Sequence, residues 1–134
     1  MSLLLANAAV ACALTGLIWT IQVVHYPLFA RVGEPEWVAY EREHQRRITL
    51  VVAPLMLANV VLAVAVVLDA ATALRWVNLA LAAGVFGATA LVYSPLHGRL
   101  GAAHDHAAID RLVALNWWRT GAWTAQALVA LALV

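Results

Sequence analysis

Residues 48–68 read ITLVVAPLMLANVVLAVAVVL, and this stretch decides the class of protein because it contains no charged side chain. A helix of about 20 apolar residues crosses the roughly 30 Å of hydrocarbon in a bilayer. Three other stretches are similarly apolar, so helices are expected over about 3–29, 36–68, 74–96 and 109–134. Lipid cannot satisfy backbone polar groups, and the alternating segments of a barrel are absent from the sequence. The sequence therefore predicts an all-α fold, an integral membrane four-helix antiparallel bundle forming a single transmembrane domain over 1–134.

Composition supports the same class. Of 134 residues, 65% are hydrophobic and 11% charged, and the mean hydropathy is +0.86. Soluble domains are about 45–50% apolar and about 25% charged, and so short a chain could not bury this much apolar surface in water. A net charge of +1 is too small to favour nucleic acid as a partner. The expected partners are the lipid bilayer and a small hydrophobic ligand, and homo-oligomerisation is left open.

Arginine is concentrated on one side of the predicted bundle. The first and third connections hold Arg31, Arg42, Arg46, Arg47, Arg99 and Arg111, whereas the second holds only Arg75. Positive residues favour the cytoplasmic side of a membrane. We therefore expect a multi-pass protein of the cell inner (plasma) membrane, with loops 1 and 3 cytoplasmic and the N- and C-termini outside.

Polar side chains inside the apolar segments recur at helical spacing. In the first segment Gln22 and Tyr26 share a face with His25 beside them, and Asn116 and Arg119 share a face of the fourth. The other members of this polar and aromatic set are Trp123 in the fourth segment, Tyr93 and His97 in the third, and His44 and Arg47 at the entry to the second. The pattern predicts a polar cavity near the cytoplasmic side, with little but Ala, Val and Leu in the other half.

Arg119 is the most informative of these residues. An arginine near the middle of a membrane costs about 2.5–3.5 kcal/mol even on the mildest scale, so it needs hydrogen-bond acceptors. Pairing with Glu41, Glu43 or Gln22 would make it a packing residue. We favour a ligand as the acceptor, because ionisable groups within the membrane usually mark functional sites.

The residues suggest an enzyme of the oxygenase, oxidoreductase or isomerase type acting on a small hydrophobic or aromatic substrate. The expected catalytic residues are His25 and His44, either of which could take a proton, and Arg119, which would stabilise an oxyanion. The expected substrate-binding residues are Gln22, Tyr26, Arg47, Tyr93, His97, Asn116, Trp117, Trp118 and Trp123.

Other functions stay open at this point. His25, His44 and His97 lie on three segments and could meet, so the site could use no cofactor, a haem or a histidine-bound metal. No HxxxH or HxxE pair links these histidines, so their spacing does not choose among the three. A small transporter or a structural subunit is the remaining alternative, and the apolar half of the bundle argues against transport.

Two short motifs resemble a known family. SPLHGRL at 94–100 and NWWRT at 116–120, with His25-Tyr26-Pro27, resemble small four-helix membrane proteins of the anthrone oxygenase-like family over most of the chain. That resemblance implies a four-helix fold and the oxidation of anthrones to anthraquinones without a bound cofactor. Asn116, Arg119 and Thr120 match the family pattern, whereas His97 stands where that family often has Asn. A fainter resemblance to the four-helix membrane protoporphyrinogen oxidase family, carried by residues 47–56 and 97–100, implies an association with haem.

Overall fold

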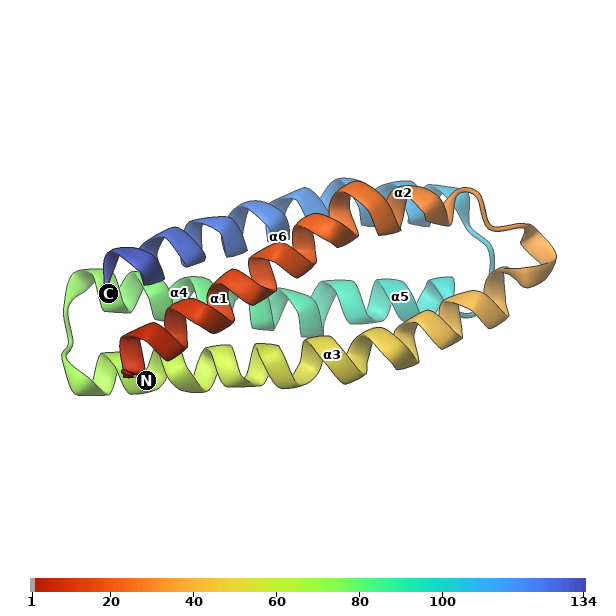
Figure 1. Cartoon of the computed structure of the whole chain (residues 1–134). Coiled ribbons are helices and arrows are strands. Elements are labelled where there is room, and N and C mark those ends of the chain that lie inside the picture. Colours follow the sequence, from red (N-terminus) through yellow and green to blue (C-terminus); the bar gives the residue numbers. More distant parts are fainter. Residues whose placement is uncertain (1) are drawn as a thin grey trace.

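The computed structural model describes residues 2–134, which form four antiparallel helical rods (Figure 1). Rod 1 comprises α1 (Leu3–Thr20), η1 (Ile21–His25) and α2 (Tyr26–Phe29), and rod 2 is α3 (Glu34–Asp69). Rod 3 comprises α4 (Ala73–Ala88), η2 (Thr89–Tyr93) and α5 (Ser94–Leu100), and rod 4 is α6 (His106–Ala132). The described residues contain no strand, which confirms the predicted all-α bundle. Both termini lie at one end, and connections 30–33 and 101–105 lie at the other, which we call the loop end.

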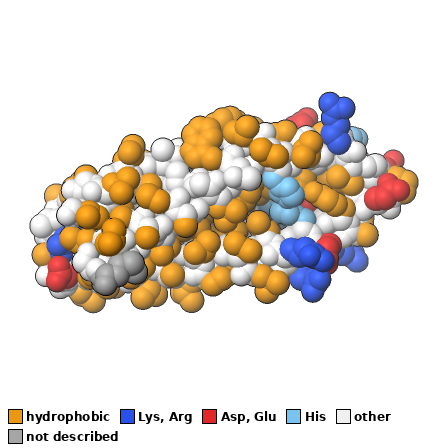
Figure 2. Space-filling model, in the orientation of Figure 1, with side chains coloured by type: hydrophobic (Ala, Val, Ile, Leu, Met, Phe, Trp, Pro, Cys, Tyr) orange, Lys and Arg blue, Asp and Glu red, His pale blue; other side chains and the backbone are white. Residues whose placement is uncertain are grey.

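Three rods, Leu3–Phe29, Glu34–Asp69 and Ala73–Leu100, are long and apolar enough to cross a membrane. Large apolar side chains project outward from them, with Leu50, Leu68 and Leu91 between 71% and 81% exposed. Figure 2 shows hydrophobic side chains over most of the visible face, with the charged ones gathered towards the two ends. Apolar surface of this extent is unusual for a soluble monomer and indicates a membrane protein.

The fourth rod differs from the sequence expectation of four equally apolar spans. α6 is long enough to cross a bilayer, but it is not among the helices apolar enough to do so by composition. The reason is visible in the fold, because Asn116, Arg119 and Gln126 lower its mean hydropathy and all three are buried inside the bundle. The low mean hydropathy of α6 is therefore explained by a polar face that points into the bundle.

Rods 1 and 3 each contain a π turn just before a proline. The backbone N–H of Tyr26 donates to the carbonyl of Ile21, and that of Ser94 donates to Thr89, both five residues back. Pro27 or Pro95 follows directly, and a proline ring clashes with the carbonyl four residues before it, which a widened turn relieves. Because Pro95 sits in the first turn of α5, rod 3 continues to Leu100, beyond the expected end near residue 96. Each π turn also rotates the residues that follow it relative to those before it.

The loop end is closed by large buried side chains. Trp37, Phe29 and Leu100 are fully buried there, and they belong to the main apolar core. The indole nitrogen Nε1 of Trp37 donates to the carbonyl of Leu100 at 2.8 Å, which fastens α3 to α5. This contact fixes the two helices that carry most of the site described below.

The opposite half of the bundle is more polar than the sequence indicated. A buried amide cluster takes one residue from each rod: Asn7, Asn59, Asn78 and Gln126. Asn59 and Gln126 exchange two hydrogen bonds of 2.9 Å, and Asn78 contacts both Gln126 and Asn7 at 3.4 and 3.3 Å. The expectation of little but Ala, Val and Leu in this half is therefore wrong. Interhelical amide pairs of this kind stabilise helix packing in membranes.

Candidate functional site

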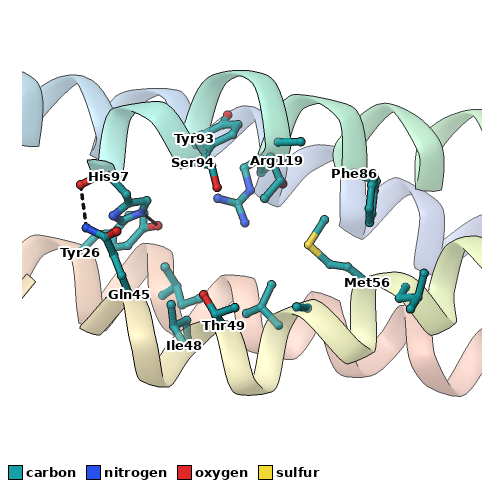
Figure 3. Close-up of a pocket in the computed structure, with 16 residues that line it drawn as sticks. Tyr26, Gln45, Ile48, Thr49, Met56, Phe86, Tyr93, Ser94, His97 and Arg119 are labelled. Carbon is teal, nitrogen blue, oxygen red and sulfur yellow. Dashed lines mark hydrogen bonds between the residues drawn. The ribbon is translucent and has the colours of Figure 1, made fainter. Parts of the chain in front are cut away.

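A cavity of about 420 Å³ lies between α3 and rod 3, alongside η2 (Figure 3). This volume is in the range of about 300–1,000 Å³ that is common for small-molecule sites. Most of the wall is apolar, and the polar residues that line it are Tyr26, Gln45, Thr49, Thr89, Tyr93, Ser94, His97 and Arg119. Leu57, Phe86 and Ala90 line its edge and are exposed on the side of the bundle, so the cavity opens laterally towards the apolar exterior. We call it the arginine cavity.

Arg119 reaches the arginine cavity from α6 and is only 5% exposed. Its guanidinium carbon lies 4.4 Å from the ring centroid of Tyr93 and 5.2 Å from that of Trp123. Among residues 2–134 it forms no salt bridge, and its buried Nε has no hydrogen-bond partner. The charge therefore lies against aromatic faces, and its unpaired Nε is available to an oxygen atom of a bound molecule.

A hydrogen-bonded chain of three side chains ends in the same cavity. His97 Nδ1 lies 2.6 Å from Glu41 Oε1, and the Tyr26 hydroxyl lies 2.9 Å from His97 Nε2. When His97 is neutral, its Nδ1–H donates to the carboxylate and its Nε2 accepts from the phenol. Gln45 holds this chain in place by donating to Glu41 Oε1 at 3.3 Å and to the His97 carbonyl at 2.7 Å. The arrangement can carry a proton from the cavity to a buried imidazole–carboxylate pair.

The other two expected catalytic residues lie on the far side of this chain. His25 Nε2 and His44 Nδ1 are 2.9 Å apart, and both imidazoles pack on the ring of Phe29 with centroids 5.1 Å away. They line a second cavity of about 650 Å³ between rod 1 and α3, which we call the histidine cavity. The three expected catalytic residues thus divide between two cavities, with Arg119 in one and His25 and His44 in the other.

The three histidines that could hold a metal or haem do converge, but with a carboxylate among them. Glu41, His44 and His97 each offer one ligand atom, and these atoms lie within 4.8 Å of one another. Glu41 thus occupies the ligand position that was expected for His25. His25 and His44 are hydrogen-bonded directly to each other, so this pair would have to separate before a haem could lie between them.

Two expected substrate-binding residues are used for helix packing. Asn116 Nδ2 donates to Gln22 Oε1 at 2.8 Å, and Gln22 Nε2 donates to the Val113 carbonyl at 3.3 Å. Both side chains are buried, and neither lines either cavity. This pair joins rods 1 and 4, so Gln22 does not act as the packing partner of Arg119 that the sequence left open.

The remaining expected residues lie in different surroundings. Trp117 and Trp118 are 52% and 55% exposed on the apolar exterior, so they do not stack in a cavity. Arg47 is exposed beside the histidine cavity and pairs with Glu43 at 2.5 Å. Trp123 is buried against the Arg119 guanidinium, where it supports the cation instead of a substrate ring.

Sequence reasoning missed the central position of Glu41, which is fully buried. A signal was present, because Glu41 and His44 are three residues apart and therefore share a face of α3. Glu-x-x-His is a spacing that places two metal-ligating or proton-transferring groups side by side. The contact of Glu41 with His97 has no such signal, because it joins two helices far apart in the chain.

The site therefore combines a carboxylate–imidazole–phenol chain, an arginine without a carboxylate partner among the described residues, and a laterally open apolar cavity. The resemblance to anthrone oxygenase-like proteins stays a prediction, and the case for a function rests on this geometry. No protein-family model, curated protein or solved structure matches the chain.

Proposed function

We propose that the chain is a membrane enzyme that transfers a proton to or from a small hydrophobic molecule bound by one oxygen atom to Arg119. One observation carries the proposal: the guanidinium of Arg119 and the Tyr26 end of the Glu41–His97–Tyr26 chain line the same cavity (Figure 3). A base on one side and an oxyanion-stabilising cation on the other are the two groups that enolisation requires.

The proposed step removes a proton from a carbon next to a carbonyl group. The C–H bond breaks, its proton moves to the Tyr26 oxygen, and the Tyr26 proton moves to His97 Nε2. The electron pair moves onto the carbonyl oxygen, where Arg119 stabilises the negative charge, and Glu41 stabilises the imidazolium. If the proton returns to a different carbon atom, the overall reaction is an isomerisation. Reaction of the carbanion with O₂ gives an oxygenase, and anthrone plus O₂ would yield anthraquinone plus water.

The lateral opening supports a substrate that arrives from the bilayer. Leu57, Phe86 and Ala90 form the exposed edge of the cavity, so a hydrophobic molecule dissolved in lipid meets the opening directly. The arginine distribution supports an inner (plasma) membrane location with the loop end in the cytoplasm. Reporter fusions at the C-terminus and within residues 101–105 test that orientation, and a cytoplasmic C-terminus would contradict it.

Anthrone is a suitable probe because its methylene hydrogens are acidic and its anion carries the charge on oxygen. The purified chain in detergent micelles is treated with a chelator and incubated with anthrone in D₂O without O₂, and deuterium uptake is followed by mass spectrometry. We expect catalysed exchange, which falls about 10²–10³-fold in Arg119→Met, the typical effect of removing one oxyanion donor. Admitting O₂ then tests whether anthraquinone forms faster than in buffer.

Arg46→Gln is the matched control, because it removes an arginine that is exposed and lines neither cavity. Tyr26→Phe keeps the ring and removes only the hydroxyl, so it tests the proton chain separately. Exchange no faster than in buffer, or equal rates in wild type and Arg119→Met, would rule out the proposed function with this substrate class.

A further inference from the structure

We propose that Glu41, His44 and His97 form a binding site for one divalent first-row transition metal ion, with a carboxylate and two imidazoles as ligands. The ligand atoms of the three side chains lie within 4.8 Å of one another. An ion bonded at about 2.0–2.2 Å holds its ligands roughly 3–3.5 Å apart. A separation of 4.8 Å would therefore close by roughly 1.5 Å on binding, which requires side-chain rotations.

The strongest observation is that two of the ligand side chains have unsatisfied buried atoms. Glu41 Oε2 and His44 Nε2 are buried, and neither has a hydrogen-bond partner among the described residues. Buried polar atoms are satisfied in the great majority of cases, so two in one cluster call for a binding partner. A metal ion accepts electron pairs from both at once.

The charge of the buried Glu41 carboxylate also favours a bound metal ion. Glu41 is fully buried, and among residues 2–134 its only ion-pair partner is His97, which carries a charge only when protonated. A buried carboxylate without a cation is costly. A divalent ion would supply the missing positive charge and would replace the proton now shared between His97 Nδ1 and Glu41 Oε1.

Each proposed ligand is also oriented by a further side chain. His25 Nε2 contacts His44 Nδ1 at 2.9 Å, the Tyr26 hydroxyl contacts His97 Nε2 at 2.9 Å, and Gln45 donates to Glu41 at 3.3 Å. When His44 Nδ1–H donates to His25, His44 Nε2 carries the lone pair that a metal needs. Hydrogen bonds of this type to the second ring nitrogen are the usual companions of metal-bound histidines.

The ligand set selects the class of ion. Two imidazoles and one carboxylate occur in catalytic zinc sites and in non-haem iron(II) sites, both of which keep positions open for water or substrate. Ca²⁺ and Mg²⁺ prefer oxygen ligands, so they fit poorly. The proposal shares Glu41 and His97 with the proposed proton chain, but metal binding is measured without any substrate, so the two are tested separately.

Co²⁺ is the probe, because its visible absorption reports nitrogen and oxygen ligation directly. The full chain, expressed without a polyhistidine tag and stripped with a chelator, is titrated with Co²⁺ in micelles and the bound ion is counted by elemental analysis. We expect one ion per chain, displaced by Zn²⁺, with proton release on binding. His44→Ala should lose the absorption, and His25→Ala should weaken binding about 10–100-fold, as removal of an orienting partner does.

The matched control removes His104, in the connection after α5, and His106, the first residue of α6, whose rings lie 4.4 Å apart outside the proposed ligand set. That double variant should bind Co²⁺ like wild type. Three results would overturn the proposal. They are unchanged Co²⁺ binding in folded His44→Ala, loss of binding in the His104 and His106 double variant, and no stoichiometric ion in wild type. If His44→Ala does not fold, Glu41→Gln provides the same test, because it keeps the size of the side chain. Arg119→Met should leave Co²⁺ binding intact, so failure here is distinct from failure of the proton-transfer reaction.

Discussion

Replacing Arg119 by methionine tests whether this residue has a catalytic role or a structural role. The two cation–π contacts, with Tyr93 at 4.4 Å and Trp123 at 5.2 Å, contribute about 0.5–2 kcal/mol each. Against this stands the cost of an arginine within the membrane, about 2.5–3.5 kcal/mol. Methionine is flexible and fills irregular apolar space, so little packing is lost. From these terms the net change in the free energy of unfolding should lie between a loss of about 1.5 kcal/mol and a gain of about 2.5 kcal/mol.

If Arg119 were instead a partner in a buried ion pair, its removal would leave a charge unpaired and cost about 3–5 kcal/mol. The two cases are told apart by equilibrium unfolding in mixed micelles titrated with sodium dodecyl sulfate, with helix content followed by circular dichroism. We expect a midpoint close to that of wild type together with a large loss of anthrone exchange. A destabilisation above about 3 kcal/mol would refute the reasoning and make Arg119 a structural residue.

Three other predictions concern contacts elsewhere in the fold. Trp37→Phe should cost about 1–3 kcal/mol in the same unfolding titration, because the Leu100 carbonyl loses its indole donor, and an unchanged midpoint would contradict this. Asn59→Leu and Gln126→Leu should show a coupling energy of about 0.6 kcal/mol, and up to about 1.7, in a double-mutant cycle, whereas strict additivity would mean that the amide pair is not formed. Co²⁺ affinity should fall in acid, because protons compete with the metal ion for its ligands, and an affinity that does not depend on pH would contradict the proposed site.

The bundle could be predicted from the sequence because apolar length alone determines it. Residues 48–68 and the other apolar stretches are long enough to cross a bilayer, and lipid permits them only a helical backbone. The connections could be placed because charged residues gather between the apolar stretches, and in the structure Gly33 and Asp105 occupy the N-cap positions of α3 and α6. These are local properties, so no knowledge of tertiary contacts was needed.

The site was predicted only in part, because helical spacing gives a face but not the neighbour that the face meets. Arg119 was correctly expected to be buried, yet Asn116 on the same helix packs against Gln22 outside the cavity. The π turns before Pro27 and Pro95 change the phase of two rods, and the 3.6-residue spacing used for the sequence does not include that change. Tyr26 and His97 follow these turns, and their contact could not be derived from spacing alone.

Glu41 lies within the helix expected over about 36–68, but the charged composition of the surrounding segment did not indicate that its side chain would be buried. In the structure α3 begins at Glu34, so the charged segment is a helix with two faces. Glu43, Arg46 and Arg47 lie on the exposed face, whereas Glu41 and His44 lie on the buried one. The composition of the segment concealed this division, which the three-residue step from Glu41 to His44 would have revealed.

The most direct test of the central claim is a kinetic double-mutant cycle between Arg119→Met and Tyr26→Phe on anthrone exchange. If both side chains act on one bound molecule in one transition state, the second substitution should cost little once the first has been made. Effects on kcat/KM that multiply independently would show that the two groups do not share a substrate, and the arginine cavity would then be no active site.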